Sequence, residues 1–124
     1  MTWKGVIIEE SLEDKEILKL FRIVGTRESY LESEEYKGTL KFHNIEVDDV
    51  RKEQFVNKAA SSIKQGWYIH IVKGDMMIVI FKGKFFEFSE HDVVKIEEAK
   101  QYGLQIGIVS EQMDFESLIK NPFG

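Results

Sequence analysis

A run of six consecutive apolar residues, Met76 to Phe81, constrains the fold of this chain more than any other feature of the sequence. It is bounded by turn residues, Gly74-Asp75 before it and Lys82-Gly83 after it, and its length is that of a β-strand. Successive side chains of a strand point to opposite sides of a sheet, so an all-apolar strand has to be covered on both faces. One layer of helices cannot do this. We therefore expect either the C-terminal helices or a second copy of the chain to cover the second face.

The segments on either side of this run predict two further strands. Trp67 to Lys73 is mostly apolar, and Gly74-Asp75 separates it from the run. The dipeptide Gly74-Asp75 is typical of a two-residue hairpin turn, because glycine accepts the positive φ that type I′ and II′ turns require. Phe85 to Phe88 follows Gly83 after a second short turn. The sequence thus predicts an antiparallel three-stranded meander within residues 67–88.

Apolar spacing and capping residues predict five elements before the meander. They are a strand from Trp3 to Glu9, a short helix capped by Ser11, two hairpin strands at about 20–30 and 37–47 joined by an exposed acidic connection at 31–35, and a helix at about 49–64 capped by Asp48 or Asp49. After the meander, a helix is predicted at 92–102 with Gly103 as its left-handed stop. A last short helix begins at Ser110 or Asp114.

The second hairpin strand carries an irregular apolar pattern. Leu40 and Phe42 alternate in one phase, whereas Ile45 and Val47 alternate in the other. A bulge near His43-Asn44 would bring all four side chains to one inward face.

These elements predict one α+β domain over residues 1–124, with a mainly antiparallel sheet of five or six strands and helices packed on it. The first six elements follow the order β-α-β-β-α-β, which resembles that of a ferredoxin-like unit, and a C-terminal β-β-α-α extension follows. A length of 124 residues is typical of a single core.

Composition excludes several kinds of chemistry. The chain has no cysteine, so disulfide frameworks, thiol nucleophiles, zinc ribbons and iron–sulfur ligation are excluded. No stretch approaches the roughly 20 consecutive apolar residues that cross a bilayer, and no glycine-rich phosphate loop occurs. We expect a soluble, cytoplasmic protein without a membrane partner and without a cofactor.

Charge is unevenly distributed along the chain. Residues 51–84 contain seven Lys or Arg against two acidic residues, whereas 1–50 contain seven against twelve and 85–124 three against eight. Our interpretation is that these charges lie on solvated faces and neutralise one another in the fold. A basic binding patch is the alternative.

Histidines supply the candidates for catalysis. His70 lies in the strand that precedes the apolar run, and His43 lies in the second hairpin strand. Together they could form a proton-transfer pair or two ligands of a metal ion. No spacing typical of a metal site occurs, and no metal site is predicted. The enzyme hypothesis is a small isomerase or hydrolase-like site in which His70 acts with a carboxylate such as Asp75 or Glu87.

Aromatic and basic residues of the meander supply the candidates for ligand binding. Exposed aromatic rings can stack on bases while lysines contact phosphates, as in proteins that bind single-stranded nucleic acid. The candidates are Trp67, Tyr68, His70, Lys73, Lys82 and Lys84. The acidic net charge of -5 argues against this function.

No catalytic motif is present, so the leading hypothesis is a noncatalytic binding or assembly module that self-associates as a homo-oligomer. An uncovered face of the meander would favour this. So would an undocked last helix, because it would expose the apolar residues of the last ten positions, Phe115, Leu118, Ile119 and Phe123. A small enzyme and a single-strand nucleic-acid binder are the alternatives, and the sequence does not name a small-molecule ligand.

Overall fold

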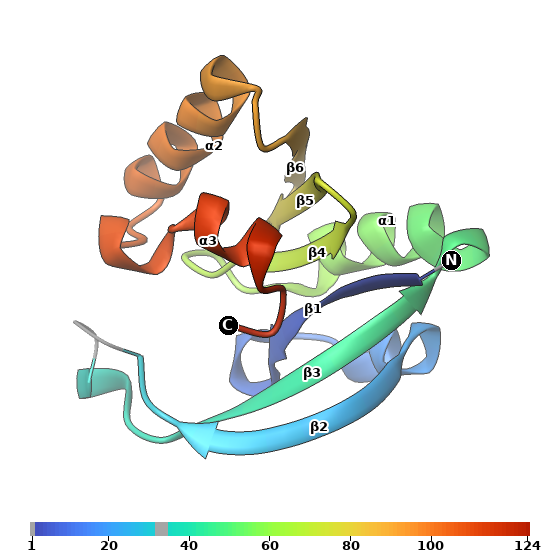
Figure 1. The fold of residues 1–124 in the computed structure, drawn as a ribbon. Coiled ribbons are helices and arrows are strands. Elements are labelled where there is room, and N and C mark those ends of the chain that lie inside the picture. Colours follow the sequence, from blue (N-terminus) through green and yellow to red (C-terminus); the bar gives the residue numbers. More distant parts are fainter. Residues whose placement is uncertain (1, 32–34) are drawn as a thin grey trace.

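A computed structural model describes residues 2–31 and 35–124 and shows a six-stranded antiparallel sheet with helices on both faces (Figure 1). The strand order is β2-β3-β1-β4-β5-β6, and every neighbouring pair is antiparallel. The strands are β1 (Thr2–Ile8), β2 (Arg22–Ser29), β3 (Leu40–Asp48), β4 (Ile69–Lys73), β5 (Met76–Phe81) and β6 (Lys84–Ser89). The α+β class with a mainly antiparallel sheet is thus confirmed.

The helical elements follow the predicted order. The α-helices are α1 (Lys52–Ser62), α2 (Val93–Gln105) and α3 (Phe115–Lys120), and the 3-10 segments are η1 (Glu9–Ser11), η2 (Lys15–Leu20), η3 (Glu35–Lys37), η4 (Asp49–Arg51) and η5 (Ser110–Gln112). Strands β2-β3-β1-β4 lie side by side, and η2 and α1 contact each other. The ferredoxin-like assignment stays a prediction. Of the predicted connection at 31–35, residues 32–34 lie outside the described residues.

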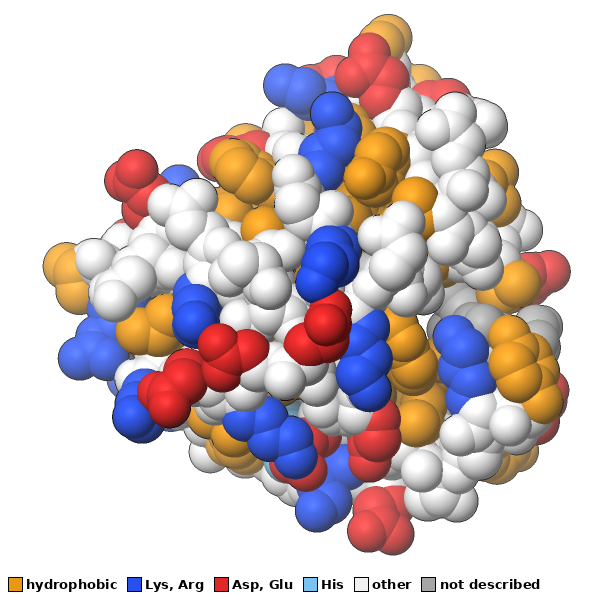
Figure 2. Space-filling model, turned by 180° about the vertical axis from the view of Figure 1, so that it is seen from behind, with side chains coloured by type: hydrophobic (Ala, Val, Ile, Leu, Met, Phe, Trp, Pro, Cys, Tyr) orange, Lys and Arg blue, Asp and Glu red, His pale blue; other side chains and the backbone are white. Residues whose placement is uncertain are grey.

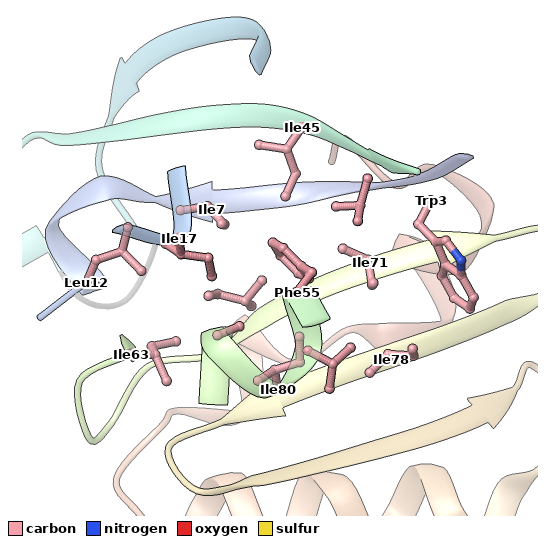
Figure 3. Close-up of a cluster of buried hydrophobic side chains, with 14 residues drawn as sticks. Trp3, Ile7, Leu12, Ile17, Ile45, Phe55, Ile63, Ile71, Ile78 and Ile80 are labelled. Carbon is pink, nitrogen blue, oxygen red and sulfur yellow. The ribbon is translucent and has the colours of Figure 1, made fainter. Parts of the chain in front are cut away.

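Both faces of the apolar strand β5 are covered by the chain itself. Ile78 and Ile80 belong to the core on the α1 side, where Phe55 of α1 lies among isoleucines of the sheet (Figure 3). Met77 and Val79 face the other way and belong to a second core, together with residues of α2 and α3. The C-terminal helices therefore provide the second cover, as one of the two predictions stated.

The last helix docks on its own domain. Phe115 is fully buried and packs against Tyr68 and Phe88, with ring centroids 5.5 and 6.0 Å apart. Ile119 is buried in the same core. The alternative in which this helix stays undocked does not hold.

The predicted bulge is in the other strand of the hairpin. β3 pairs with β1 without interruption from Phe42 to Asp48, while the register of β2 shifts between Ile23 and Gly25. A bulge at His43-Asn44 was therefore a wrong prediction. Leu40 and Phe42 need no phase correction, because both are buried on the face opposite Ile45.

One predicted helix cap is wrong, and another is confirmed in position only. Ser11 ends η1 and donates its hydroxyl to the Ile8 carbonyl, and Asp14 caps η2 through a 2.9 Å bond from the Glu16 amide. Asp48 stands at the N-cap position of η4, which leads directly into α1, but its side chain makes no capping hydrogen bond, and Asp49 is not the N-cap residue of either helix. Asp49 instead accepts hydrogen bonds from the Trp3 indole and from Lys73. In contrast, Asp114 caps α3, as one of the two predictions for that helix stated.

The sequence predicted that α2 ends at Gly103, and this prediction is wrong. The helix continues to Gln105, and the left-handed residue is Gly107, with φ at 95°. A Cβ at Gly103 would lie 2.3 Å from the Met113 sulfur. Glycine is present here because α2 packs closely against the segment that follows it.

Gly5 should be the glycine of the sheet that tolerates substitution least. A Cβ at Gly5 would lie 1.9 Å from the backbone oxygen of His70, so Gly5→Ala has to push β1 and β4 apart. We expect a loss of about 3 kcal/mol in the free energy of unfolding, measured by urea denaturation. Gly25→Ala is the control, since its Cβ would meet Asn44 at an ordinary 3.5 Å. Equal stability of the two variants would contradict the close approach of β1 and β4.

Candidate functional site

A pocket of about 320 Å³ lies on the sheet face opposite α1. Its sheet side is formed by Val6 and Ile8 of β1, Phe42 of β3 and His70 of β4. The facing wall comes from the C-terminal segment, that is, from residues 108–120 and from the last four residues, 121–124, which we call the tail. In Figure 1 the tail runs from α3 toward β1, above the curved ribbon of β2 and β3. A volume of this size is typical of small-molecule sites.

The pocket exists because the C-terminal helices cover only part of the sheet. α2 contacts β6 and α3 contacts β4, so both helices pack at the β4–β6 end (Figure 1). The β1-β3-β2 end curves away from them, and among the described residues the tail, Leu31 and Lys37 of η3 add side chains to the pocket wall there. An apolar hollow remains between the two ends.

His70 is buried and holds the tail on the sheet. Its Nε2 atom lies 2.7 Å from the backbone oxygen of Pro122, 52 residues away in the sequence. Because a carbonyl oxygen only accepts, Nε2 carries the proton and donates it. Burial lowers the pKa of His70 to about 4, although the bond to Pro122 acts in the opposite direction. The imidazole is therefore neutral at pH 7.

Tyr68 makes a second link between the sheet end and the C-terminal segment. Its hydroxyl donates a hydrogen bond to the backbone oxygen of Gln112. Burial raises the pKa of Tyr68 above its usual range, and the negative charge of Asp114 adds to the shift. With its neutral hydroxyl donated and its ring against Phe115, Tyr68 fixes η5 and α3 in place.

His43 is not near His70. Their neighbours on β1 are Ile7 for His43 and Val6 for His70, and adjacent residues of a strand point to opposite faces. The structure therefore places the two imidazoles on opposite sides of the sheet, and they form no proton-transfer pair.

His43 instead lies between a hydroxyl and a carboxylate. Its Nδ1 is 2.9 Å from Thr26 Oγ1, and its Nε2 is 2.9 Å from Glu9 Oε1. The bond from His43 is the main reason why the pKa of Glu9 lies below its usual value. This order of groups is that of a nucleophile, base and orienting acid. However, none of the three lines the pocket, so the arrangement ties β2, β3 and η1 together.

Neither carboxylate predicted to act with His70 lies beside it. Asp75 is in the turn between β4 and β5, beyond Lys73, the last residue of β4. Glu87 pairs with Ile78 and so faces the α1 side of the sheet.

The three lysines among the predicted ligand-binding residues lie outside the pocket. Lys73 contacts both carboxylate oxygens of Asp49 at 2.8 and 2.9 Å, and Lys82 pairs with Glu13. Lys84 lies over the ring of Phe86, 5.2 Å from its centroid. Figure 2 shows side chains of both signs next to one another on the rear face. Charge neutralisation within the fold is confirmed for Lys73 and Lys82.

Trp67, Tyr68 and His70 do line the pocket, and two cations that the sequence analysis missed join them. The Arg27 guanidinium lies 4.9 Å from the centroid of the Phe42 ring, and the Lys37 ammonium lies 4.2 Å from that of Trp67. No local pattern marks either cation. Their position depends on the β2-β3 register and on where the C-terminal segment docks.

Comparisons with known proteins identify no relative. No family model matches the chain, and neither does a curated protein or a solved structure. Within residues 2–31 and 35–124, no group of three or more His, Cys, Asp or Glu side chains could hold a metal ion. In the same residues, no helix combines the length and apolar character needed to cross a membrane.

Acid should weaken the fold through His70. The folded pKa of about 4 lies below the ordinary histidine value of 6.5, so between these values the unfolded chain binds more protons, and the free energy of unfolding falls as the pH falls. We expect His70 to account for a loss of about 2–3 kcal/mol between pH 7 and pH 4.5.

The control is His70→Gln, whose amide can still donate to Pro122 and does not titrate. Urea denaturation at both pH values should show a smaller loss for this variant by about the same 2–3 kcal/mol. The neighbouring Tyr68 and Asp114 are present in both proteins, so their contribution cancels. Parallel losses would show that His70 is not buried in its neutral form.

Proposed function

We propose that this protein is a noncatalytic binding module that takes a small, largely apolar molecule into the pocket between its sheet and its C-terminal segment. The observation that carries the proposal is the pocket itself, about 320 Å³ in volume and bounded by aliphatic and aromatic side chains. Pockets of this kind, with a few polar groups among apolar walls, are typical of ligand sites.

The polar groups of the pocket favour binding over catalysis. The Nε2 proton of His70 is donated to the backbone of the tail, and the hydroxyl of Tyr68 is donated to Gln112. Both side chains therefore hold the wall in place. A general base near pH 7 would need a pKa close to that value, whereas the pKa of His70 is about 4.

The placement of aromatic and basic residues favours a small ligand over single-stranded nucleic acid. Stacking on bases needs exposed aromatic rings next to lysines that can reach phosphates. Here Trp67 and Tyr68 line a pocket, while Lys73 and Lys82 pair with carboxylates elsewhere on the surface.

Self-association is a second proposal, and it now rests on β2. The apolar strand β5 no longer calls for a partner, because α2 and α3 cover it. β2, however, is an edge strand in which Ile23 and Val24 are 47 and 50 % exposed beside the bulge. An exposed edge with apolar side chains favours pairing with another strand, and a second copy of β2 is the partner that we propose.

A bulky side chain in the pocket should abolish ligand binding. N-phenyl-1-naphthylamine, a neutral apolar dye, should bind with an increase in fluorescence. Leu118→Trp fills the space beside α3 and should reduce affinity at least about tenfold. Val50→Trp is the control, because Val50 is 91 % exposed and lies outside the pocket. Equal dye binding by both variants, each with the wild-type thermal midpoint, would refute the proposal.

Self-association predicts a species of twice the chain mass in gel filtration with light scattering at micromolar concentration. Ile23→Lys should convert it to monomer, because a charge at the edge opposes strand pairing. Val94→Lys, at a residue of α2 that is 71 % exposed, should leave the dimer intact. A wild-type protein that is monomeric throughout the concentration series would remove this proposal without affecting the pocket.

A further inference from the structure

We propose that the ligand is an amphipathic anion, a molecule with an apolar body and a carboxylate that pairs with Arg27. This inference rests on the proposed binding function and adds the chemical class of the ligand. It follows from the charges around the pocket.

Arg27 lies at the pocket wall beside the tail, where a Cβ on Gly124 would be 3.7 Å from its Nη2 atom. Among the described residues, no carboxylate lies within ion-pair distance of it, and its hydrogen bond is a long one of 3.3 Å to Asn44 Oδ1. Its guanidinium carries five N–H donors, so most of them remain available. Because it lies over Phe42 at the pocket wall, its position is defined by the ring as well as by Asn44.

A second arginine on the same strand shows the contrast. Arg22 faces the same side of the sheet as Arg27, since both pair with alternate residues of β3. It donates to Glu46 at 2.9 Å and to Asp48 at 3.3 Å. The carboxylates of β3 thus neutralise one arginine of β2, whereas the arginine at the pocket has an aromatic ring and an amide in their place.

Cations already lie on two aromatic faces of the pocket, which disfavours a cationic ligand. Lys37 lies over Trp67 and Arg27 lies over Phe42, at 4.2 and 4.9 Å from the ring centroids. A positively charged ligand would have to compete for these faces and would meet like charges. An anion would instead find the positive charge of Arg27 over Phe42.

The acidic residues of the pocket come from the C-terminal wall. Asp114 accepts hydrogen bonds from the Ser117 amide and hydroxyl, at 3.4 and 2.8 Å, and so caps α3. Glu111 lies on η5. Negative charge there repels an anionic head group. We therefore expect the carboxylate at Arg27 and the apolar body against Val6, Ile8 and Leu118.

The test compares three ligands that share one body. They are 4-phenylbutyrate, 4-phenylbutanamide and 4-phenylbutylamine, titrated into the full chain at pH 7 and low salt with two-dimensional NMR as the readout. The carboxylate should bind about tenfold or more tightly than the amide, and the amine most weakly. Chemical shift changes should include Val6, Ile8 and Leu118.

Arg27→Met should remove the preference for the carboxylate, so that the carboxylate and the amide bind with equal affinity. Its control is Arg22→Met on the same strand, which should keep the tenfold preference, and the thermal midpoints of both variants show that they fold. Where Arg27→Met does not fold, Arg27→Gln takes its place.

Several results overturn the inference. Equal binding of the three ligands, tighter binding of the amine, or an unchanged preference in Arg27→Met each refutes the anion class. Failure of all three ligands to bind at millimolar concentration refutes it as well. In every one of these cases, binding of the neutral dye to the same pocket decides separately whether the proposed function survives.

Discussion

The structure depends on a central pair of strands, β4 and β5, that are buried on both faces. Burying them takes α1 on one side and the C-terminal helices on the other. α2 and α3 are short and pack at the β4–β6 end, so they cannot also cover the curved β1-β3-β2 end (Figure 1). The same constraint that forms the second core thus leaves the pocket beside it. The fold and the site therefore have one physical origin: the sheet is wider than the layer of C-terminal helices that covers it.

Elements with a strong local signal could be predicted from the sequence. The all-apolar β5 and the turn at Gly74 were predicted correctly because alternation and positive φ are local properties. The bulge was assigned to the wrong strand because the alternation of apolar residues in β3 changes phase between Phe42 and Ile45, whereas the register shift lies in β2. The sequence does not show that each face of the sheet has its own core, so that apolar residues of both phases can be buried. The prediction that α2 ends at Gly103 was wrong for a similar reason. Glycine is required at this position because α2 packs closely against Met113, and a contact of this kind cannot be recognised from the residues that usually end helices.

Half of the candidate site could be predicted from the sequence, and the other half depends on contacts between distant residues. Trp67, Tyr68 and His70 were identified because aromatic and titratable residues cluster in the predicted strand at 67–73, of which β4 forms residues 69–73. Arg27 and Lys37 reach the same pocket from the acidic N-terminal part of the chain, and only the register of β2 on β3 brings Arg27 over Phe42. Segment charges pointed to the lysines of residues 51–84. Lys73 and Lys82 pair with carboxylates of the flanking segment, which removes them from ligand binding.

His70 and Tyr68 explain how so short a helix as α3 can form a defined wall. A helix of six residues is unstable by itself, so its place depends on contacts with the sheet. Apolar contacts of Phe115 and Ile119 supply most of the burial, but they have little directional preference. The bonds from His70 to Pro122 and from Tyr68 to Gln112 are directional, and they fix both ends of the segment that contains α3. Buried polar groups here determine the shape of the pocket more than they add to stability, because each bond replaces one to water.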